Sequence, residues 1–416
     1  MEEYGFELNL CNNRLNIFTK SILLHRRIAY YQIYLILLRV SVSNINITTF
    51  GMRNEKDFIP SLTGIRALCA YGIFIYHTHM FIPDIAPKLR LLIQQLDTFI
   101  TFFFVISGFI ITHIYYDTKS LQRKELFRYG INRFARIFPI LFILVTITFL
   151  IQFYRGSESQ LETFKEFFLN ISFIKGFSKE YILTGIGPSW TLSVDVLFYI
   201  LAPLLFYFTK SIISLIKFTL LFYLIGILLT LLFFNKTSAG FFNDFPFTFY
   251  FTFFGRAFEF VCGIYLALVI KNEMPSSLLR KIGKHSTWIG IAIVILSLIG
   301  LYLVANFYQI EKANQTMVGI IINNLFMPTG AVFLFYGLIH YRSILQAFLS
   351  SKIMVELGNA TYSFYLLHTS FLISWIFKFI SKNIAITFMC MLVFSYIFYR
   401  LVEQPLAKLI RNRYSK

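Results

Sequence analysis

The chain has 416 residues, of which 57% are hydrophobic and only 14% are charged. Soluble globular domains carry about a quarter charged residues, so this composition excludes an ordinary soluble domain, a disordered chain and a typical nucleic-acid-binding protein. It predicts a membrane protein built from spans of about 20 apolar residues. Lysine and arginine outnumber aspartate and glutamate by 38 to 20, and the placement of this excess decides its meaning.

Residues 1–54 form an N-terminal extension whose apolar patch, 28–42, is interrupted by Arg39. No continuous apolar run followed by a small-residue cleavage site is present, so a signal peptide is not predicted. Two interpretations are open: translation begins at Met52, or the extension is an amphipathic helix on the membrane surface. Residues 55–411 are expected to form a transmembrane domain, and residues 412–416 a cytoplasmic tail.

Apolar runs bounded by charges predict an all-α bundle of about ten transmembrane helices. The runs are longer than the roughly ten residues of a barrel strand, which excludes a β-barrel. They lie near 61–82, 95–116, 137–154, 190–208, 212–234, 247–270, 286–305, 318–339, 360–380 and 384–401.

Basic residues concentrate in three segments, 117–136, 271–285 and the region after 399, which are separated by even numbers of predicted spans. Segment 155–189 is balanced between basic and acidic residues. Cytoplasmic loops carry an excess of lysine and arginine. The three basic segments, and therefore both ends of the bundle, are expected in the cytoplasm.

The first span carries two ionisable residues, Arg66 and His77. Such residues cost about 3 kcal/mol or more inside hydrocarbon and mark candidate functional sites. At 100° per residue the two lie within about 20° of one helix face, about 16 Å apart along the axis. A snorkelling arginine and a core histidine are the structural alternative. The shared face favours a lined cavity, in which a neutral His77 accepts a proton.

Arg133 and Arg136 share one helix face where the third span begins. Guanidinium groups match phosphate oxygens in pairs, so together with Arg66 they indicate a polyphosphate site. For any single arginine, cytoplasmic anchoring is the better explanation. Asp195 lies inside the fourth span and needs a partner, for which His77 or Arg66 is expected.

Two further spans carry polar groups. Arg256 and Glu259 lie three positions apart in the sixth span and are expected to form a structural ion pair. Tyr362, Tyr365 and His368 recur every three positions in the ninth span as a polar stripe. The four cysteines form no close pair and predict neither a disulfide framework nor a zinc site, and no metal is expected.

In this order, these segments resemble the acyltransferase-3 family of integral membrane acyltransferases over residues 55 to about 411. Single pieces are weakly specific, whereas seven in order are strongly so. The sequence departs from the family at Asp195, where glutamate is usual, and in its N-terminal extension. The matching pieces are Ser61-Leu-Thr-Gly-Ile-Arg66-Ala-Leu with His77, Phe104-Val-Ile-Ser107-Gly-Phe109, Arg133-Phe-Ala-Arg136-Ile-Phe-Pro139, Trp190-Thr-Leu-Ser193-Val-Asp195, Arg256-x-x-Glu259-Phe, Gly358-x-x-x-Tyr362-x-x-Tyr365-x-x-His368 and Glu403-Gln-Pro405.

The resemblance implies a stand-alone enzyme of the bacterial cytoplasmic membrane, without an SGNH hydrolase-like domain. It implies transfer of an acyl group, usually acetyl, from cytoplasmic acyl-CoA to a carbohydrate hydroxyl of a surface polysaccharide, lipopolysaccharide or other glycoside. The expected partners are the lipid bilayer, acyl-CoA and a carbohydrate or glycolipid acceptor, with no nucleic acid. A proton-coupled transporter or glycolipid flippase using the same charges is the alternative.

The expected mechanism assigns the CoA phosphates to three arginines, Arg66, Arg133 and Arg136. His77 is expected to act as general base on the acceptor hydroxyl, or to carry the acyl group itself. Asp195 is expected to orient His77 and stabilise its cationic form. Four residues are unranked candidates for binding the oxyanion or the acceptor: Ser107, Tyr362, Tyr365 and His368.

Overall fold

The computed structural model describes residues 58–118, 122–156, 159–236 and 239–414. The chain divides into two units, Met1–Thr49 and Phe50–Lys416, and the fold described below belongs to the second. The N-terminal extension, with its two open interpretations, and the last two residues of the tail lie outside the described residues.

The described ranges are helical, and the β-type pairing recorded in them is one isolated antiparallel bridge between Ser178 and Phe241. The α-helices of the first half are α2 (Pro60–Thr78), α3 (Pro87–Ile93), α4 (Ile100–Tyr115), α5 (Arg123–Arg155), α6 (Gln160–Ile171), α7 (Trp190–Phe208) and α8 (Ile212–Phe233). Those of the second half are α9 (Phe245–Phe251), α10 (Phe253–Ile270), α11 (Ser277–Ile282), α12 (Ser286–Tyr308), α13 (Met317–Ile321), α14 (Met327–His340), α15 (Ile344–Leu349), α16 (Lys352–Asn359), α17 (Thr361–Leu367), α18 (Phe371–Phe379), α19 (Ile384–Phe398) and α20 (Gln404–Tyr414).

Short 3₁₀ and π-helical turns connect several of these helices. The 3₁₀ turns are His79–Phe81, Gln94–Phe99, Tyr116–Thr118, Ile174–Phe177, Gly187–Ser189, Gly283–His285 and Ala313–Gln315. Two π-helical segments, Ile322–Phe326 and Tyr399–Glu403, join α13 to α14 and α19 to α20 as continuous rods.

Eight helices of the described residues are long and apolar enough to cross a membrane. They confirm a polytopic all-α membrane protein. The two expected spans that are not among them, 61–82 and 360–380, correspond to α2 and to the pair α17 and α18. A break at His368–Ser370, where the Ser370 side chain caps α18, divides the latter pair. The helices that qualify are Pro87–Tyr115, Arg123–Arg155, Gly187–Phe208, Ile212–Phe233, Phe245–Ile270, Ser277–Tyr308, Met317–His340 and Ile384–Tyr414.

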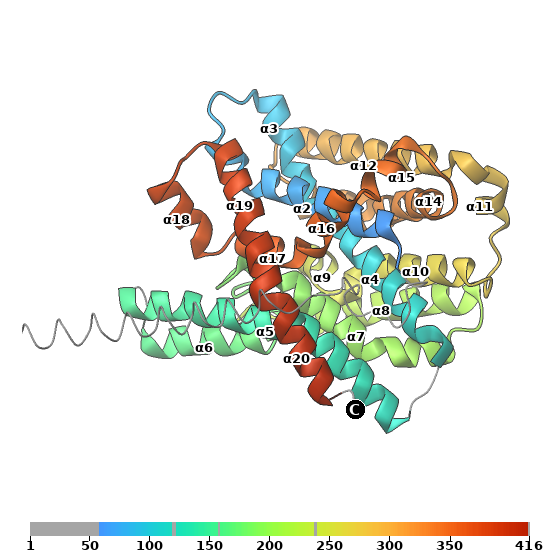
Figure 1. The fold of residues 1–416 in the computed structure, drawn as a ribbon, viewed down its shortest axis with the longest axis horizontal. Coiled ribbons are helices and arrows are strands. Elements are labelled where there is room, and N and C mark those ends of the chain that lie inside the picture. The colour runs from blue at the N-terminus through green and yellow to red at the C-terminus, as the bar shows by residue number, and fades with distance from the viewer. Residues whose placement is uncertain (1–57, 119–121, 157–158, 237–238, 415–416) are drawn as a thin grey trace, which may run out of the picture. The chain divides into compact units, whose positions relative to one another are not determined.

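Helix α5 begins well before the apolar run that predicted it and continues through Gly130 and Pro139. It is 33 residues long, and Arg133 and Arg136 lie within it. Helix α6 packs back along α5, and Figure 1 shows the two as an antiparallel hairpin on the left of the fold. The arginines are therefore held rigidly on a long helix rather than in a loop.

Helices α4 and α10 pack closely against each other in the core. A Cβ at Gly108 of α4 would lie 2.3 Å from the carbonyl oxygen of Phe260, and one at Gly263 of α10 only 2.1 Å from that of Val105. Helix α2 packs on α4, α16 and α17. These contacts place α2, α4, α5, α7 and α17 around one cavity, which is described below.

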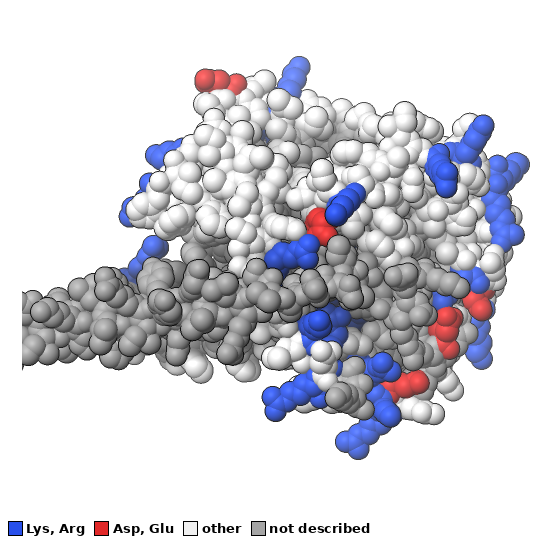
Figure 2. Space-filling view, in the orientation of Figure 1, with Lys and Arg blue, Asp and Glu red and all other residues white. Residues whose placement is uncertain are grey.

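Charged side chains of the described residues lie at the margins of the face drawn in Figure 2 and in a group near its centre. Figure 2 shows lysine and arginine gathered along the right and lower edges of this face. In the same orientation Figure 1 places α11 at the right, and the beginning of α5 and the end of α20 below. These elements belong to the three segments whose basic character predicts the cytoplasmic side.

Candidate active site

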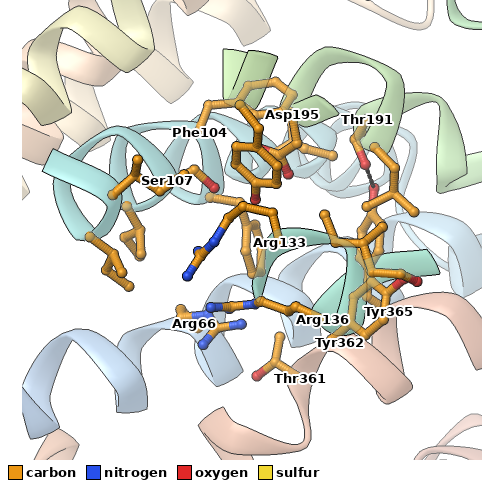
Figure 3. A pocket seen from close by; sticks show the side chains of 18 residues that line it. Arg66, Phe104, Ser107, Arg133, Arg136, Thr191, Asp195, Thr361, Tyr362 and Tyr365 are labelled. Atoms are coloured by element: carbon orange, nitrogen blue, oxygen red, sulfur yellow. Dashed lines mark hydrogen bonds between the residues drawn. The ribbon is translucent and has the colours of Figure 1, made fainter. Parts of the chain in front are cut away.

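Three arginines from two helices converge on a pocket with about 720 Å³ of empty space. Arg66 comes from α2, and Arg133 and Arg136 come from α5. Figure 3 shows their guanidinium groups gathered together, with Ser107 and Asp195 on one side. Seven of the residues singled out in the sequence line this pocket: Arg66, Ser107, Arg133, Arg136, Asp195, Tyr362 and Tyr365.

A second pocket, with about 570 Å³ of empty space, shares the three arginines and Tyr362 with the first. Its other walls include Thr63 from the beginning of α2, Ile114 from the end of α4, and Glu403. These positions lie toward the helix ends that are expected in the cytoplasm. The arginines therefore form a shared wall between a deeper pocket and one nearer the cytoplasmic side.

The arginines form few direct contacts with protein groups in the described part of the chain. Arg133 donates from Nη2 to the Tyr115 hydroxyl at 3.4 Å, while its buried Nε has no partner among the described residues. Arg66 and Arg136 form no hydrogen bond or ion pair with any described residue. Their nearest electrostatic neighbours include each other, and like charges in an apolar bundle repel.

Two carboxylates lie near the arginines, but neither forms an ion pair with them in the described part of the chain. Asp195 interacts electrostatically with all three, and its buried Oδ1 has no hydrogen-bond partner there. Glu403 accepts a hydrogen bond from the Ser363 hydroxyl and is buried. Asp195 is therefore part of the arginine pocket.

The expected pairing of Asp195 with His77 is not found. His77 instead lies against His368, whose Nε2 is 3.1 Å from Nδ1 of His77. Helix α17, which His368 directly follows, packs on α2, whereas α7, which carries Asp195, packs on α4, α5 and α10. The partner of His77 is thus a histidine, because a different helix lies beside it.

The hydrogen bonds of the two histidines define one tautomer for each. Nδ1 of His77 lies 3.0 Å from the Ile73 carbonyl oxygen, and Nδ1 of His368 lies 3.3 Å from that of Phe364. A carbonyl oxygen only accepts, so both Nδ1 atoms carry the proton. Nε2 of His368 then accepts from His77, and Nε2 of His77 keeps a lone pair that can take a proton.

Tyr365 connects the arginine pocket to the histidine pair. It lines the pocket, and its ring centroid lies 5.6 Å from that of His368. Its hydroxyl donates to the Pro188 carbonyl at 3.2 Å and lies 3.3 Å from the Thr191 hydroxyl. The Tyr362 hydroxyl donates to the Ile137 carbonyl at 2.6 Å. Both tyrosine hydroxyls are therefore already bonded to protein groups.

Sequence reasoning overlooked Lys312, which lies at the His77 end of α2. Its Nζ is 4.8 Å from the centroid of the Tyr76 ring, and that ring packs on His77 with centroids 4.6 Å apart. Burial opposes its charge, but Tyr76 and Asp97 outweigh this and raise the pKa of Lys312 above its ordinary value. A lone lysine in a polar loop gives no sequence signal for this position.

Arg256 and Glu259 form a fully buried ion pair of 2.5 Å behind the α4 wall of the pocket. Arg256 also donates from Nε to the Tyr250 carbonyl at 2.7 Å, and Thr101 donates to Glu259 at 2.9 Å. The Arg256 guanidinium lies 5.7 Å from the ring of Phe104, which lines the pocket. The pair supports α4 from behind. Within the described ranges no cluster of three or more His, Cys, Asp or Glu side chains could hold a metal ion.

Several known proteins are similar in sequence to this chain. The O-acetyltransferase OatA of Staphylococcus aureus (strain NCTC 8325 / PS 47) is 23% identical over 390 residues, covering 84% of this chain and 57% of that protein. The peptidoglycan O-acetyltransferase OatA of Listeria monocytogenes is 24% identical over 174 residues, covering 36% of this chain and 24% of its own. No solved structure is significantly similar.

The chain thus spans just over half the length of the Staphylococcus relatives that it matches. A family model described as an acyltransferase domain matches residues 59–400, which include every residue of the two pockets except Phe58 and Glu403. With its helical membrane fold, this match shows that the chain belongs to the acyltransferase-3 family.

Proposed function

We propose that this chain is a membrane O-acetyltransferase that moves an acetyl group from cytoplasmic acyl-CoA to a carbohydrate hydroxyl. The observation that carries the proposal is the convergence of Arg66, Arg133 and Arg136 on two joined pockets without an ion-pair partner among the described residues. Buried like charges are unfavourable until an anion compensates them. The phosphates of acyl-CoA supply such an anion, and guanidinium groups bind them bidentately.

The relative depth of the two pockets defines the orientation in which acyl-CoA binds. The phosphates bind at the shared arginine wall, and the pantetheine arm enters the deeper pocket toward Tyr365 and the histidine pair. Along α2 the distance from Arg66 to His77 is about 16 Å. Asp195 then takes a different role from the one expected: its unpartnered Oδ1 accepts a hydrogen bond from an amide N–H of the pantetheine arm.

His77 acts as the general base. Its Nε2 lone pair takes the proton of the acceptor hydroxyl while the hydroxyl oxygen attacks the thioester carbonyl. The tetrahedral intermediate collapses, the carbon–sulfur bond breaks, and the CoA thiolate recovers the proton from His77. His368 holds the Nδ1 proton of His77 and so keeps Nε2 free for this task. Direct attack by Nε2, which gives an acyl-histidine, is the second route.

The acceptor is proposed to be a sugar of the cell envelope. Peptidoglycan is the first acceptor to test, because the Listeria relative is named for it. Its sugars lie outside the cytoplasmic membrane, on the side where α2 ends at Thr78 if the basic segments are cytoplasmic. His77 and Lys312 are at that end, whereas Arg66 is nearer the other, so donor and acceptor approach from opposite sides.

The test measures CoA release from acetyl-CoA by the full chain in lipid nanodiscs, with and without soluble peptidoglycan fragments. Acceptor-dependent release is expected. His77→Asn is expected to lower turnover by about 100-fold or more. His340→Asn is the matched control, because His340 also lies near a main-chain carbonyl but belongs to the far end of α14. Equal turnover of both variants would remove His77 from the mechanism.

The same preparation separates the enzyme from the transporter alternative. A transporter or flippase would move its substrate across proteoliposome membranes without acetyl-CoA, and its rate would not depend on the donor. Donor-independent movement of the carbohydrate together with no CoA release would refute the proposed enzymatic function.

A further inference from the structure

A fourth arginine approaches the phosphate site from the C-terminal helix, outside the range that matches the family model. Helix α20 packs on α5, and Arg411 near its end interacts electrostatically with Arg133 and Arg136. Arg411 is half-buried, and its Nε donates to the Ala407 carbonyl at 3.0 Å. The family model matches residues 59–400, so Arg411 lies outside the matched range.

Arg411 lies on the face of α20 that is turned toward the bundle. Glu403, Ala407 and Arg411 follow one another at four-residue intervals, which places them on one helix face. Ala407 and Glu403 are buried, and Glu403 lines the outer pocket with the other arginines. Arg413 lies about 200° around the helix from Arg411 and is exposed. Glu403, Ala407 and Arg411 therefore extend the wall of the second pocket, the one nearer the cytoplasmic side, toward the end of the helix.

The arginines along this wall lie at different depths in the bundle. Arg411 is two turns, or about 12 Å, beyond Glu403 toward the end of α20. Tyr115, which ends α4, interacts with both Arg133 and Arg411. A donor that enters with its thioester first leaves its nucleotide end outermost. Acyl-CoA carries a diphosphate within the chain and a separate phosphate on the ribose 3′ oxygen, at that outer end.

We propose that Arg411 binds the ribose 3′-phosphate of the acyl-CoA donor and so distinguishes CoA from pantetheine thioesters that lack it. The assignment rests on the proposed function, because it takes acyl-CoA as the ligand of the arginine pockets. Arg66, Arg133 and Arg136 remain with the diphosphate. The C-terminal helix thereby acts as part of the donor site.

The experiment compares the affinity of the full chain in nanodiscs for CoA and for 3′-dephospho-CoA. Arg411→Gln is expected to weaken CoA binding roughly ten-fold or more, which is the effect of losing one charge-assisted contact. It is expected to leave the affinity for dephospho-CoA unchanged. Arg413→Gln, two residues away on the exposed face, is expected to bind both ligands as the wild type does.

Each outcome has a separate meaning. If Arg411→Gln binds CoA as tightly as Arg413→Gln does, Arg411 serves another anion such as a lipid headgroup and the proposal is wrong. The proposal is equally wrong if Arg411→Gln weakens both nucleotides alike. Failure of the proposed function looks different: the wild type would bind neither nucleotide, and Arg66→Gln would change nothing. Arg411→Lys retains the charge and is expected to recover part of the CoA affinity.

Discussion

His77 and His368 form a pair in which each ring is anchored to a main-chain carbonyl one turn before it. The acceptor for the shared proton is Nε2 of His368, at 3.1 Å. This geometry resembles the role of the carboxylate in a triad, which fixes one tautomer of the base. A neutral imidazole fixes the tautomer without stabilising a cation as strongly, so its removal tests orientation in particular.

Replacing His368 by Phe keeps the ring and removes the acceptor. Turnover is expected to fall roughly ten-fold or more, because the Nδ1 proton of His77 then has only the Ile73 carbonyl as acceptor and the ring is oriented less firmly. The KM for acetyl-CoA is expected to stay the same, since the arginine pocket is untouched. His368→Gln, whose amide oxygen can accept the proton, is expected to retain more activity than His368→Phe. Steady-state kinetics checks this, and equal loss in both variants would contradict an orienting role.

Lys175 is a buried amine in the connection between α6 and α7. It is 1% exposed, and its Nζ donates to the carbonyl oxygens of Thr184 at 2.8 Å and Ile186 at 3.0 Å. Burial lowers the pKa of Lys175 to about 7, against a smaller opposing effect of Glu166. These two hydrogen bonds stabilise the loop that precedes α7, the helix that carries Asp195.

This lowered pKa predicts a pH dependence of stability. Between pH 7 and about 10.4 the unfolded chain binds a proton on Lys175 that the native state has released, so stability rises with pH in that window. The thermal midpoint of the wild type in detergent is expected to increase from pH 7 to pH 9. The increase is expected to be smaller in Lys175→Met. Lys179→Met is the control, because Lys179 is exposed and pairs with Asp244 at 2.6 Å. A parallel increase in all three proteins would contradict the prediction.

At the scale of the elements, the position of α4 depends on two glycines. The backbones of α4 and α10 approach so closely that a Cβ at Gly263 would lie 2.1 Å from the Val105 carbonyl oxygen and 2.6 Å from the Phe109 nitrogen. Main-chain atoms cannot turn aside as a flexible side chain can. Helix α4 carries Phe104 and Ser107 into the pocket, so any separation of the helices also changes the site.

Gly263→Ala is therefore expected to lower stability by about 1–3 kcal/mol and to reduce turnover. Gly130→Ala is the matched control within α5, where a Cβ would meet no atom within 4 Å. There the better helix propensity of alanine is expected to stabilise the protein by about 0.5–1 kcal/mol. Thermal midpoints and CoA release of the two variants check the prediction. A Gly263→Ala protein as stable and active as Gly130→Ala would show that the helices can separate freely.

The helices also show which parts of the fold and of the site can be predicted from the sequence alone. Uniform apolar runs predict the eight qualifying helices, because the bilayer dictates their length and composition. The shared face of Arg66 and His77 follows from helix geometry alone. The partner of His77 does not, because which helices lie side by side depends on packing that hydropathy cannot reveal. Asp195 and His368 are both polar groups in predicted spans, and only the packing of α17 on α2 distinguishes them.

At the scale of the whole molecule, basic residues, which give the chain its net charge of +18, have two roles: orienting the bundle in the membrane and binding the donor. Fifteen of the 38 basic residues lie in the three segments that predict the cytoplasmic side. Arg133 and Arg136 of these segments converge with Arg66 of α2 on the proposed donor site. Orientation and donor binding are thus coupled, because the arginine wall lies toward the end of the bundle where the basic segments 117–136, 271–285 and the region after 399 are expected.

This coupling predicts a definite topology. Single cysteines replace Lys124 of α5, Arg280 of α11 or Lys179, all exposed positions, in a variant whose four native cysteines are alanine. A membrane-impermeant maleimide is expected to label Lys179→Cys in intact cells, and the other two only after permeabilisation. Labelling of Lys124→Cys from outside would show that the bundle has the opposite orientation in the membrane. It would then place the arginine wall away from cytoplasmic acyl-CoA, so the donor assignment would fail with the topology.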